Sequence, residues 1–271
     1  MKTRVVVKRY GSIDEGFISW IIGILDSVYK TSEEPPLIVE LHVYESNDLY
    51  RTYALLERLS LDIKHLDVEE YLAYHDAWYG VPRIHVIYEV SNRVNKHVFK
   101  SAIIHEAVHS ILHGDVASYL VTLPQKLNSL TLNDNVKWEF ITIIASSIKD
   151  VEVTSYILER KLDPNLLDFI RYNVRISEED LELLRLAVEG YEFKLLAIAS
   201  LLKMLAPLSS LLLYNIVSDE LIEEVDNIIC KYPNDISDIV WRLVREVIPS
   251  IRGDLQDKLD TITDFIIDSI M

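Results

Sequence analysis

The residues of this chain that are best suited to chemistry lie at positions 105–109, which read His-Glu-Ala-Val-His. In an α-helix, residues four apart lie on one face, so His105 and His109 can bind a single metal ion together. Imidazole nitrogen is a common zinc ligand, and a catalytic zinc site keeps one position open for water. Glu106 lies beside the pair, where its carboxylate can take a proton from that water. The spacing predicts a zinc (Zn2+) site with His105 and His109 as ligands and Glu106 as the general base.

The residues around this motif favour the helix that its chemistry requires. From Ser91 to His113 the chain contains no Gly or Pro, and most positions between the two histidines and on either side of them are apolar. Gly114 follows, and glycine often ends a helix at such a position. The same pattern also fits an amphipathic helix whose histidines are held only by hydrogen bonds. Metal analysis distinguishes the two interpretations.

A catalytic zinc site needs a third protein ligand. His113 continues the four-residue spacing, but each such step moves about 6 Å along the helix axis. Coordination by all three histidines would be strained, so contact with a ligand or with the substrate suits His113 better. Asp150 and Glu152 lie in an otherwise apolar helix predicted over residues 138–161, where acids are costly unless they pair or bind a metal. The two acids are about 200° apart around that helix, so only one of them can face the metal.

The neighbours of the two acids give a preference between them. Ser147 and Thr154 flank Asp150 with small side chains that allow two helices to approach closely. Lys149, near Glu152, is expected to face solvent. We therefore favour Asp150 as the third ligand and keep Glu152 as the alternative.

These motifs resemble those of the zincin superfamily of metallopeptidases, in particular predicted archaeal members. The resemblance covers roughly residues 83–160. It rests on His-Glu-Ala-Val-His-Ser-Ile-Leu-His-Gly-Asp at 105–115 and on a later acid-bearing segment, Lys-Asp-Val-Glu-Val, at 149–153. It implies that the two histidines of the first motif bind zinc, that the intervening glutamate is the base, and that an acid of the second helix completes the site.

Peptide hydrolysis also calls for a donor that stabilises the carbonyl oxygen as it gains negative charge. His113 and Tyr156, which lies one helical turn after Glu152, are the candidates. Both side chains could equally be structural, because buried Tyr and His side chains are common in protein cores.

The first hundred residues alternate between strand and helix patterns. Strands are predicted at 5–10, 37–44 and 83–90, and helices at 12–28 and 48–60, the first of them with Ser12 as its N-cap. The third strand leads directly into the motif helix, so the sheet is expected to pack on that helix. An edge strand beside such a helix can bind an extended peptide through backbone hydrogen bonds.

After Gly114 nearly every segment has helical apolar spacing. The predicted helices are 138–161, 164–173, 177–189, 191–216, 219–230, 235–248 and 254–270. The fold class expected is α+β: a small N-terminal α/β sheet unit packed on a zincin-like helix, followed by a mostly α-helical region. We place the division at residues 1–115 and 116–271, with the second part supplying the third metal ligand.

Composition narrows the function classes further. A formal net charge of −16 disfavours binding to nucleic acid, because a phosphate backbone needs a cationic surface. The single Cys230 excludes an intrachain disulfide and fits a reducing compartment, so a cytoplasmic protein is expected. Residues 195–217 are strongly apolar, but Lys203 and Pro207 interrupt them. They leave about 15 uncharged residues in a row, fewer than the ~20 of a membrane span. A kinked core helix is expected there, and no membrane association.

The leading hypothesis is a zinc-dependent metallopeptidase that acts on a peptide or protein substrate. The alternative is a zinc-binding but non-catalytic helical interaction protein. A fourth protein ligand that closes the metal site would favour this alternative.

Overall fold

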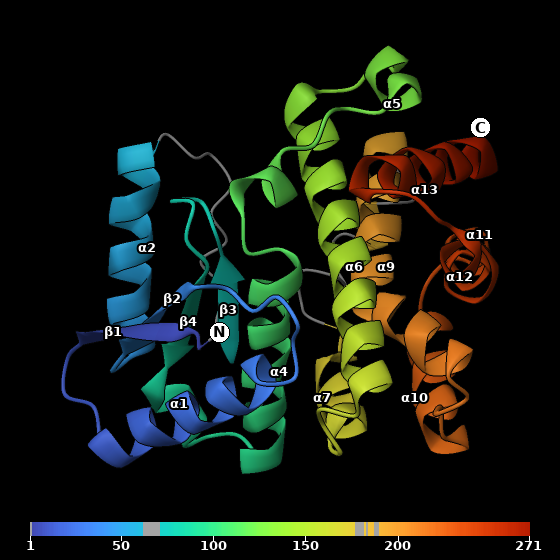
Figure 1. Cartoon of the computed structure of the whole chain (residues 1–271). Coiled ribbons are helices and arrows are strands. Elements are labelled where there is room, and N and C mark those ends of the chain that lie inside the picture. Colours follow the sequence, from blue (N-terminus) through green and yellow to red (C-terminus); the bar gives the residue numbers. More distant parts are fainter. Residues whose placement is uncertain (1, 62–70, 177–181, 183, 187–189) are drawn as a thin grey trace. The chain divides into compact units, whose positions relative to one another are not determined.

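The structure is a computed structural model that describes residues 2–61, 71–176, 182, 184–186 and 190–271. The chain divides into two compact units. The first comprises Met1–Leu120 and Tyr156–Phe169, and the second comprises Val121–Ser155 and Ile170–Met271. The predicted fold class is confirmed, because a small N-terminal sheet with helices precedes a mostly helical region (Figure 1).

A four-stranded sheet with the order β1-β2-β4-β3 forms the centre of the first unit. The strands are β1 (Arg4–Tyr10), β2 (Ile38–Tyr44), β3 (Ala73–Asp76) and β4 (Arg83–Ile87). The pairs β1/β2 and β2/β4 are parallel, whereas β3 runs antiparallel to β4. β4 ends three residues earlier than predicted, because Tyr88–Ser91 forms the short helix α3. β3 was missed because its four residues, Ala-Tyr-His-Asp, are too few to show an alternating pattern.

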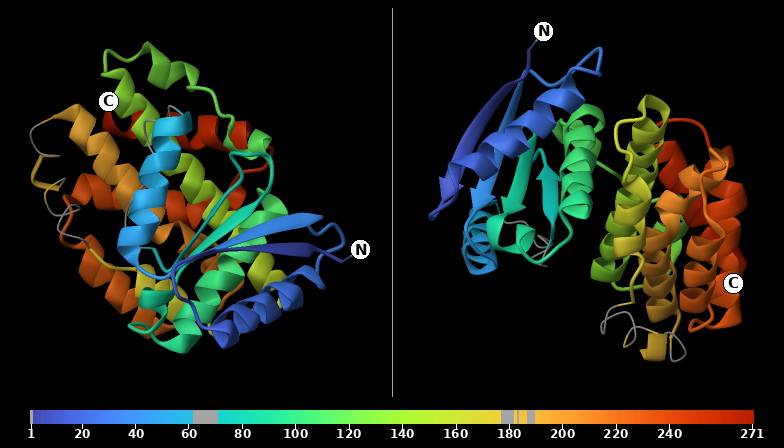
Figure 2. Two further views of the ribbon diagram at one scale, coloured as in Figure 1. Left: turned by 90° about the vertical axis from the view of Figure 1, so that its left-hand side faces the viewer. Right: turned by 90° about the horizontal axis from the view of Figure 1, so that it is seen from below.

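Helices cover both faces of this sheet (Figures 1 and 2). The helices α1 (Glu15–Tyr29) and α4 (Lys96–Leu112) pack together on one face, and α2 (Asn47–Leu61) covers the other. Successive side chains of a strand point to opposite faces. In β2, Leu41 and Val43 therefore point to one face of the sheet, and Tyr44 points to the other. Tyr44 packs on the α2 side, and all three side chains are buried. The sheet is therefore buried on both faces.

The first helix begins later than predicted. Its N-cap is Asp14, whose side chain accepts a hydrogen bond from the backbone N–H of Phe17 at 2.8 Å. Ser12 instead donates its backbone N–H to the Glu45 carboxylate at 2.8 Å, which ties it to the residue after β2. The prediction that Ser12 is the N-cap was wrong because a tertiary contact holds Ser12 and an acid nearer the helix takes its place.

The second unit is helical in its described residues, and α6 and α7 each continue across the division between the units. After the short η1 (Val116–Tyr119) of the first unit, the helical elements are α5 (Gln125–Ser129), α6 (Asp134–Arg160), α7 (Leu166–Asn173), α9 (Tyr191–Leu213), α10 (Asp219–Ile229), α11 (Asn234–Arg242), η2 (Leu243–Val247), α12 (Ile248–Ser250) and α13 (Leu255–Ile270). The helix predicted at 177–189 falls largely outside the described residues.

Helix α9 is the apolar segment noted in the sequence. By length and composition alone it could cross a membrane, the one such helix in the described part of the chain. However, 72% of its most apolar window is buried, as in the core helix of a soluble protein. Pro207 lies inside the helix, as predicted.

Candidate metal centre

Helix α4 brings the two motif histidines together. The Nε2 atoms of His105 and His109 lie 3.0 Å apart, and both side chains are buried. If each nitrogen lay about 2.05 Å from zinc, this separation would give an N–Zn–N angle of about 94°, compared with ~109° in a regular tetrahedron. Moving the two nitrogen atoms about 0.3 Å further apart would bring this angle to the tetrahedral value. The nitrogens therefore fit one zinc ion, as the i, i+4 spacing predicts.

The sequence explains where α4 begins and ends. Asn95 is the N-cap, and its side chain accepts a hydrogen bond from the backbone N–H of His97 at 2.8 Å. Gly114 follows the helix, as predicted. A Cβ at Gly114 would lie only 2.2 Å from the carbonyl oxygen of Ser110, so this close approach requires glycine. The Ser110 hydroxyl is hydrogen-bonded to Tyr29 Oη at 2.8 Å, which joins α4 to α1.

A third histidine lies beside this pair. The ring of His75 on β3 is stacked with that of His109, with centroids 5.9 Å apart and planes inclined by 13°. Tyr119 Oη is hydrogen-bonded to His75 Nδ1 at 3.1 Å. On the other side, Phe169 lies against His105 with ring centroids 5.4 Å apart. Sequence reasoning missed His75 and Tyr119. His75 could be placed on the α4 face only once β3 and its register were known.

Glu106 is partly exposed and lies close to Tyr119. Burial raises the pKa of the Tyr119 hydroxyl well above its ordinary value, and the negative charges of Asp76 and Glu106 raise this pKa further. Tyr119 is therefore a protonated phenol at neutral pH. The Glu106 carboxylate is thus near enough to act electrostatically on the Tyr119 hydroxyl.

His113 is the C-cap of α4. Its backbone N–H donates to the carbonyl oxygen of His109 at 2.7 Å, and its ring meets that of His109 edge-on, with centroids 5.4 Å apart. Tyr156, on the last turn of α6, packs its ring against the guanidinium of Arg160 at 4.3 Å. That contact gives Tyr156 a structural role, and a role in catalysis stays a prediction.

The two acids of α6 point in different directions within the second unit, as their spacing predicts. Asp150 pairs with Lys203 on α9, and Glu152 pairs with Lys258 on α13. The Asp150 side chain is 14% exposed and that of Glu152 is 31% exposed. Lys149 is buried, which corrects the expectation that it faces solvent. The choice between the two acids as the third ligand stays a prediction.

The opposite face of the sheet, covered by α2, holds a buried ion network centred on Arg83. Its guanidinium donates from Nε and Nη2 to the Asp76 carboxylate at 2.7 and 2.8 Å, and from Nη1 to Glu57 at 2.7 Å. His85 Nε2 is hydrogen-bonded to Asp76 at 2.9 Å, and His85 Nδ1 to Tyr44 Oη at 3.1 Å. Burial alone would raise the pKa of Asp76, but the contacts with His85 and Arg83 outweigh it and hold this pKa well below the usual range. Asp76 is therefore ionised.

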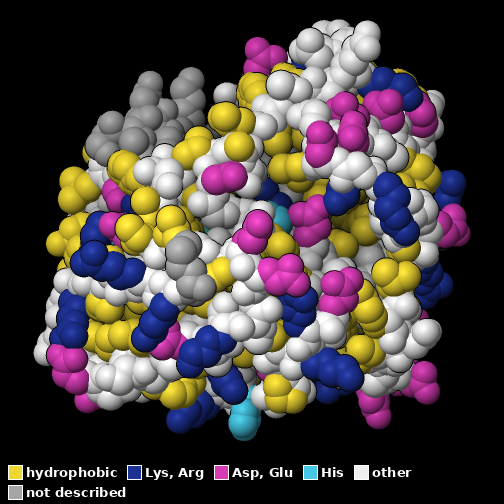
Figure 3. All heavy atoms as spheres, in the orientation of Figure 1, with side chains coloured by type: hydrophobic (Ala, Val, Ile, Leu, Met, Phe, Trp, Pro, Cys, Tyr) yellow, Lys and Arg dark blue, Asp and Glu magenta, His cyan; other side chains and the backbone are white. Residues whose placement is uncertain are grey.

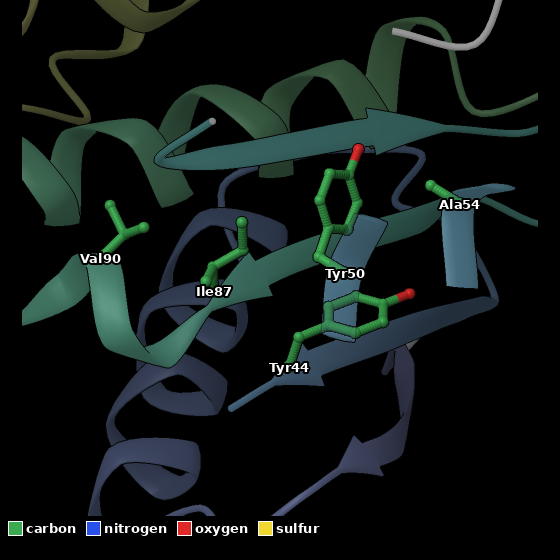
Figure 4. Packing of buried hydrophobic residues seen from close by; sticks show 5 residues of the cluster. All are labelled: Tyr44, Tyr50, Ala54, Ile87 and Val90. Carbon is green, nitrogen blue, oxygen red and sulfur yellow. The ribbon is translucent and has the colours of Figure 1, made fainter. Parts of the chain in front are cut away.

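His42 extends this polar layer along the sheet. It is hydrogen-bonded to Glu40 at 3.0 Å and to Tyr10 Oη at 3.1 Å. Burial and the neighbouring His85 lower the pKa of His42 to about 4, so the ring is neutral at pH 7. Tyr44, Tyr50 and their apolar neighbours pack against the same face (Figure 4).

Neither a protein-family model, nor a curated protein, nor a solved structure gives a significant match to this chain. The resemblance to zincins therefore rests on its motifs, and the geometry around α4 carries the functional argument.

Proposed function

We propose that this chain is a zinc-dependent metallopeptidase that hydrolyses peptide bonds in peptide or protein substrates. The observation that carries the proposal is the 3.0 Å separation of the two Nε2 atoms of His105 and His109, buried on one face of α4. Zinc is the ion that imidazole ligands at this spacing suit best. An acid of α6 is proposed as the third ligand, with Asp150 preferred to Glu152.

The chemistry divides between the metal and Glu106. Zinc, when bound, supplies a Lewis acid that acidifies water and polarises a carbonyl group. Glu106 directly follows His105 on α4, and its partly exposed carboxylate can accept the proton of the attacking water. The same carboxyl group then delivers this proton to the leaving amine. Glu106 is thus proposed as both general base and general acid.

The sheet offers a binding mode for the substrate. β3 packs against α4 and, among the described residues, pairs only with β4. An extended peptide can add to such an edge by backbone hydrogen bonds, which recognise the main chain of any sequence. A four-residue edge suits a short extended segment. This supports an unfolded or flexible peptide as the substrate.

Charge and thiol chemistry support the expected setting. Acidic and basic side chains are interspersed on the face shown in Figure 3, and the chain carries a net charge of −16. Such a surface favours a polypeptide substrate over nucleic acid. Cys230 is an exposed free thiol, which suits a reducing compartment and supports a cytoplasmic location.

The test combines metal analysis with hydrolysis of fluorescein-labelled unfolded casein. We expect about one zinc per chain in protein purified without chelator. Glu106→Gln should keep the zinc and lower kcat/KM by about 10²- to 10⁴-fold, because the amide keeps the shape of the side chain but not its basicity. Glu139→Gln is the matched control, since this exposed glutamate of α6 should leave both readouts unchanged.

Two results would contradict the proposal in different ways. Absence of zinc after reconstitution would leave an ordinary helix with hydrogen-bonded histidines. Bound zinc without any activity that depends on Glu106 would indicate the zinc-binding interaction protein instead.

A further inference from the structure

We propose that the open edge of β1 binds an extended acidic segment of another protein, which joins the sheet as a further strand. This segment carries two acidic residues four positions apart, with an apolar residue midway between them. The proposal goes beyond the peptidase function and does not rest on it, because it concerns the edge of the sheet that lies opposite β3. The residues that carry it all belong to the first unit.

β1 is the outermost strand of the sheet. Among the described residues it pairs only with β2, and it lies at the margin of the first unit in Figure 2. The backbone N–H of Arg4 donates to the carbonyl oxygen of Leu37 at 2.9 Å, and the carbonyl oxygen of Tyr10 accepts from the N–H of Glu45 at 2.9 Å. Both ends of β1 are therefore held to the neighbouring strand through even-numbered residues.

This register determines which backbone groups of β1 stay open. In a parallel pair, every second residue directs both its N–H and its C=O towards the neighbouring strand. The even-numbered residues of β1 take this role, since the pairing runs without a skipped residue. The N–H and C=O groups of Val5, Val7 and Arg9 consequently point away from β2. They form a row of donors and acceptors that a further strand can bind.

β1 lacks two of the features by which proteins commonly block a free edge. It contains no proline, and each of its seven residues has a single partner on β2, so no bulge interrupts it. Three half-buried valines, at positions 5–7, occupy its centre. The cations near its ends are a third common device, and they repel only a strand that is also cationic. The edge is thus selective for charge and otherwise suited to pairing.

The α2 face of β1 carries side chains in the order cation, apolar, cation. Tyr10 lies on this face, because its hydroxyl is hydrogen-bonded to His42 at 3.1 Å. Alternate residues share a face, so Arg4, Val6 and Lys8 lie there as well. Within the described part of the chain, no acidic group lies at ion-pair distance from the exposed Arg4.

The second cation of this row is also accessible. Lys8 contacts Glu40 of β2 at 2.7 Å, but its side chain remains 43% exposed. Exposed ion pairs of this kind contribute little to stability, so Lys8 can turn to an incoming carboxylate at small cost. Ile38, which lies beside Arg4 on β2, is 42% exposed and adds apolar surface next to the row.

These side chains define the sequence pattern of the occupant. In an extended segment, alternate residues lie on one face. Acidic residues at its first and fifth positions would face Arg4 and Lys8, and an apolar residue at its third position would face Val6. Cross-strand pairs of opposite charge and of apolar side chains both stabilise adjacent strands.

Charge disfavours a second copy of this chain at the same edge. Residues 2–10 contain four cations and no acid, although the whole chain has a net charge of −16. Antiparallel pairing of two β1 strands centred on Val6 would place Arg4 opposite the second copy's Lys8. Like charges directly opposite each other destabilise a strand pair. An acidic segment gains from the same cations.

The probe is the fluorescein-labelled peptide Thr-Glu-Thr-Val-Thr-Glu-Thr, which presents the same pattern in either strand direction. The control peptide Glu-Glu-Thr-Val-Thr-Thr-Thr has the same composition, but its acids fall on opposite faces. Fluorescence anisotropy measures binding to the full chain and to Glu106→Gln, so that cleavage of the probe cannot resemble weak affinity. We expect saturable binding that weakens as salt is added, and about fivefold weaker binding of the control peptide.

Substitutions test the backbone and the charged row separately. Val7→Pro removes an outward N–H and keeps the groups that bond to β2, so it should weaken binding about tenfold. Val7→Thr keeps that N–H and should bind the probe as the wild type does. Arg4→Glu should weaken binding about tenfold, because it repels one acid of the probe. Lys231→Glu, at an exposed position of the second unit, changes the net charge equally and should leave the affinity unchanged.

Amide hydrogen exchange, followed by NMR, reads the edge without any substitution. The N–H groups of Val5, Val7 and Arg9 should exchange quickly in the free protein and about tenfold or more slowly with bound probe. The N–H groups of Val6 and Lys8 are bonded to β2 and should be protected in both states. This measurement decides the proposal even if Val7→Pro fails to fold.

Three results would overturn the proposal. The first is no saturable binding of the probe up to about 1 mM. The second is binding that leaves exchange at Val5, Val7 and Arg9 unchanged, which would place the peptide elsewhere, for example at β3. The third is a dimer in sedimentation that Val7→Pro dissociates, which would assign the edge to a second copy. None of these results depends on zinc or on the activity of Glu106, so the peptidase function and the β1 edge can fail independently.

Discussion

On the α2 face of the N-terminal sheet, Arg83, Asp76 and His85 satisfy one another within hydrogen-bond distance. On the α4 face of the same sheet, His105 and His109 bring two identical nitrogen atoms to within 3.0 Å. Both faces bury titratable groups at similar depth. They differ in that the first face pairs opposite charges and the second gathers groups of one kind.

The difference shows how buried polar groups can be used. A carboxylate between a guanidinium and an imidazole is compensated by the protein itself, so it contributes to holding β3 against β4 and α2. Two imidazoles at 3.0 Å share at most one hydrogen between their facing nitrogens, and a cation bridges them better. We therefore interpret the α2 face as structural and propose that the α4 face binds a ligand. The predictions below test this division from the largest expected effect to the smallest.

The largest effect is expected on metal binding. His109→Ala should weaken zinc binding by more than the roughly 100-fold that loss of an outer-shell partner costs, because it removes a ligand itself. His85→Ala, on the opposite face, should keep the zinc affinity and lower the unfolding temperature instead. Competitive zinc titration and thermal unfolding of both variants separate the two roles. Equal zinc affinity in the two variants would abolish the distinction between the faces.

The third ligand gives the next test. Asp150→Ala should lower zinc affinity strongly, whereas Glu152→Ala should change mainly stability. The matched controls are Lys203→Ala and Lys258→Ala, which break the same ion pairs but keep the acids. A selective loss in Glu152→Ala would reverse the assignment. Wild-type zinc affinity in both folded acid variants would exclude α6 and make His113 the leading third ligand.

Breaking the α2 face should cost stability without affecting the metal. Arg83→Met leaves the Asp76 carboxylate, whose side chain is 3% exposed, without its main cation. We expect the free energy of unfolding to fall by about 3–5 kcal/mol, as for other broken buried ion pairs. Chemical denaturation measures the loss, and zinc content should stay at one per chain. The double variant Arg83→Met/Asp76→Leu should recover part of the stability, because the buried Asp76 carboxylate that lost its cation is no longer present.

The smallest effect concerns pH. The pKa of His42 is lowered to about 4 in the folded chain, from an ordinary value of 6.5. Between these values the unfolded chain binds more protons than the folded chain, so stability rises with pH and is lost as the pH falls from 6.5 towards 4. This group should contribute up to about 3 kcal/mol to that loss. Urea denaturation of His42→Gln should show a flatter pH dependence in this window, and an unchanged slope would contradict the neutral buried ring.

Local patterns were sufficient for much of this fold. The four-residue spacing of His105 and His109 depends only on helix geometry, and the absence of Gly and Pro up to Gly114 predicted the helix that carries them. The same holds for the long apolar helices of the second unit. Only the reason for Gly114 differs from a simple helix stop, because a Cβ there would collide with the Ser110 carbonyl oxygen.

The sequence by itself determined the elements whose signal lies within one helical turn or one strand repeat, and with them the two histidines and the base of the proposed site. Tertiary structure decided what depends on pairing between distant segments. β3 is too short to be seen in isolation, and its antiparallel register on β4 sends His75 to the α4 face and Asp76 to the α2 face. A shift of one residue would exchange them, because neighbouring side chains of a strand point in opposite directions. The contact of Tyr119 with His75 and the charge network around Arg83 follow from that register, which no local pattern records.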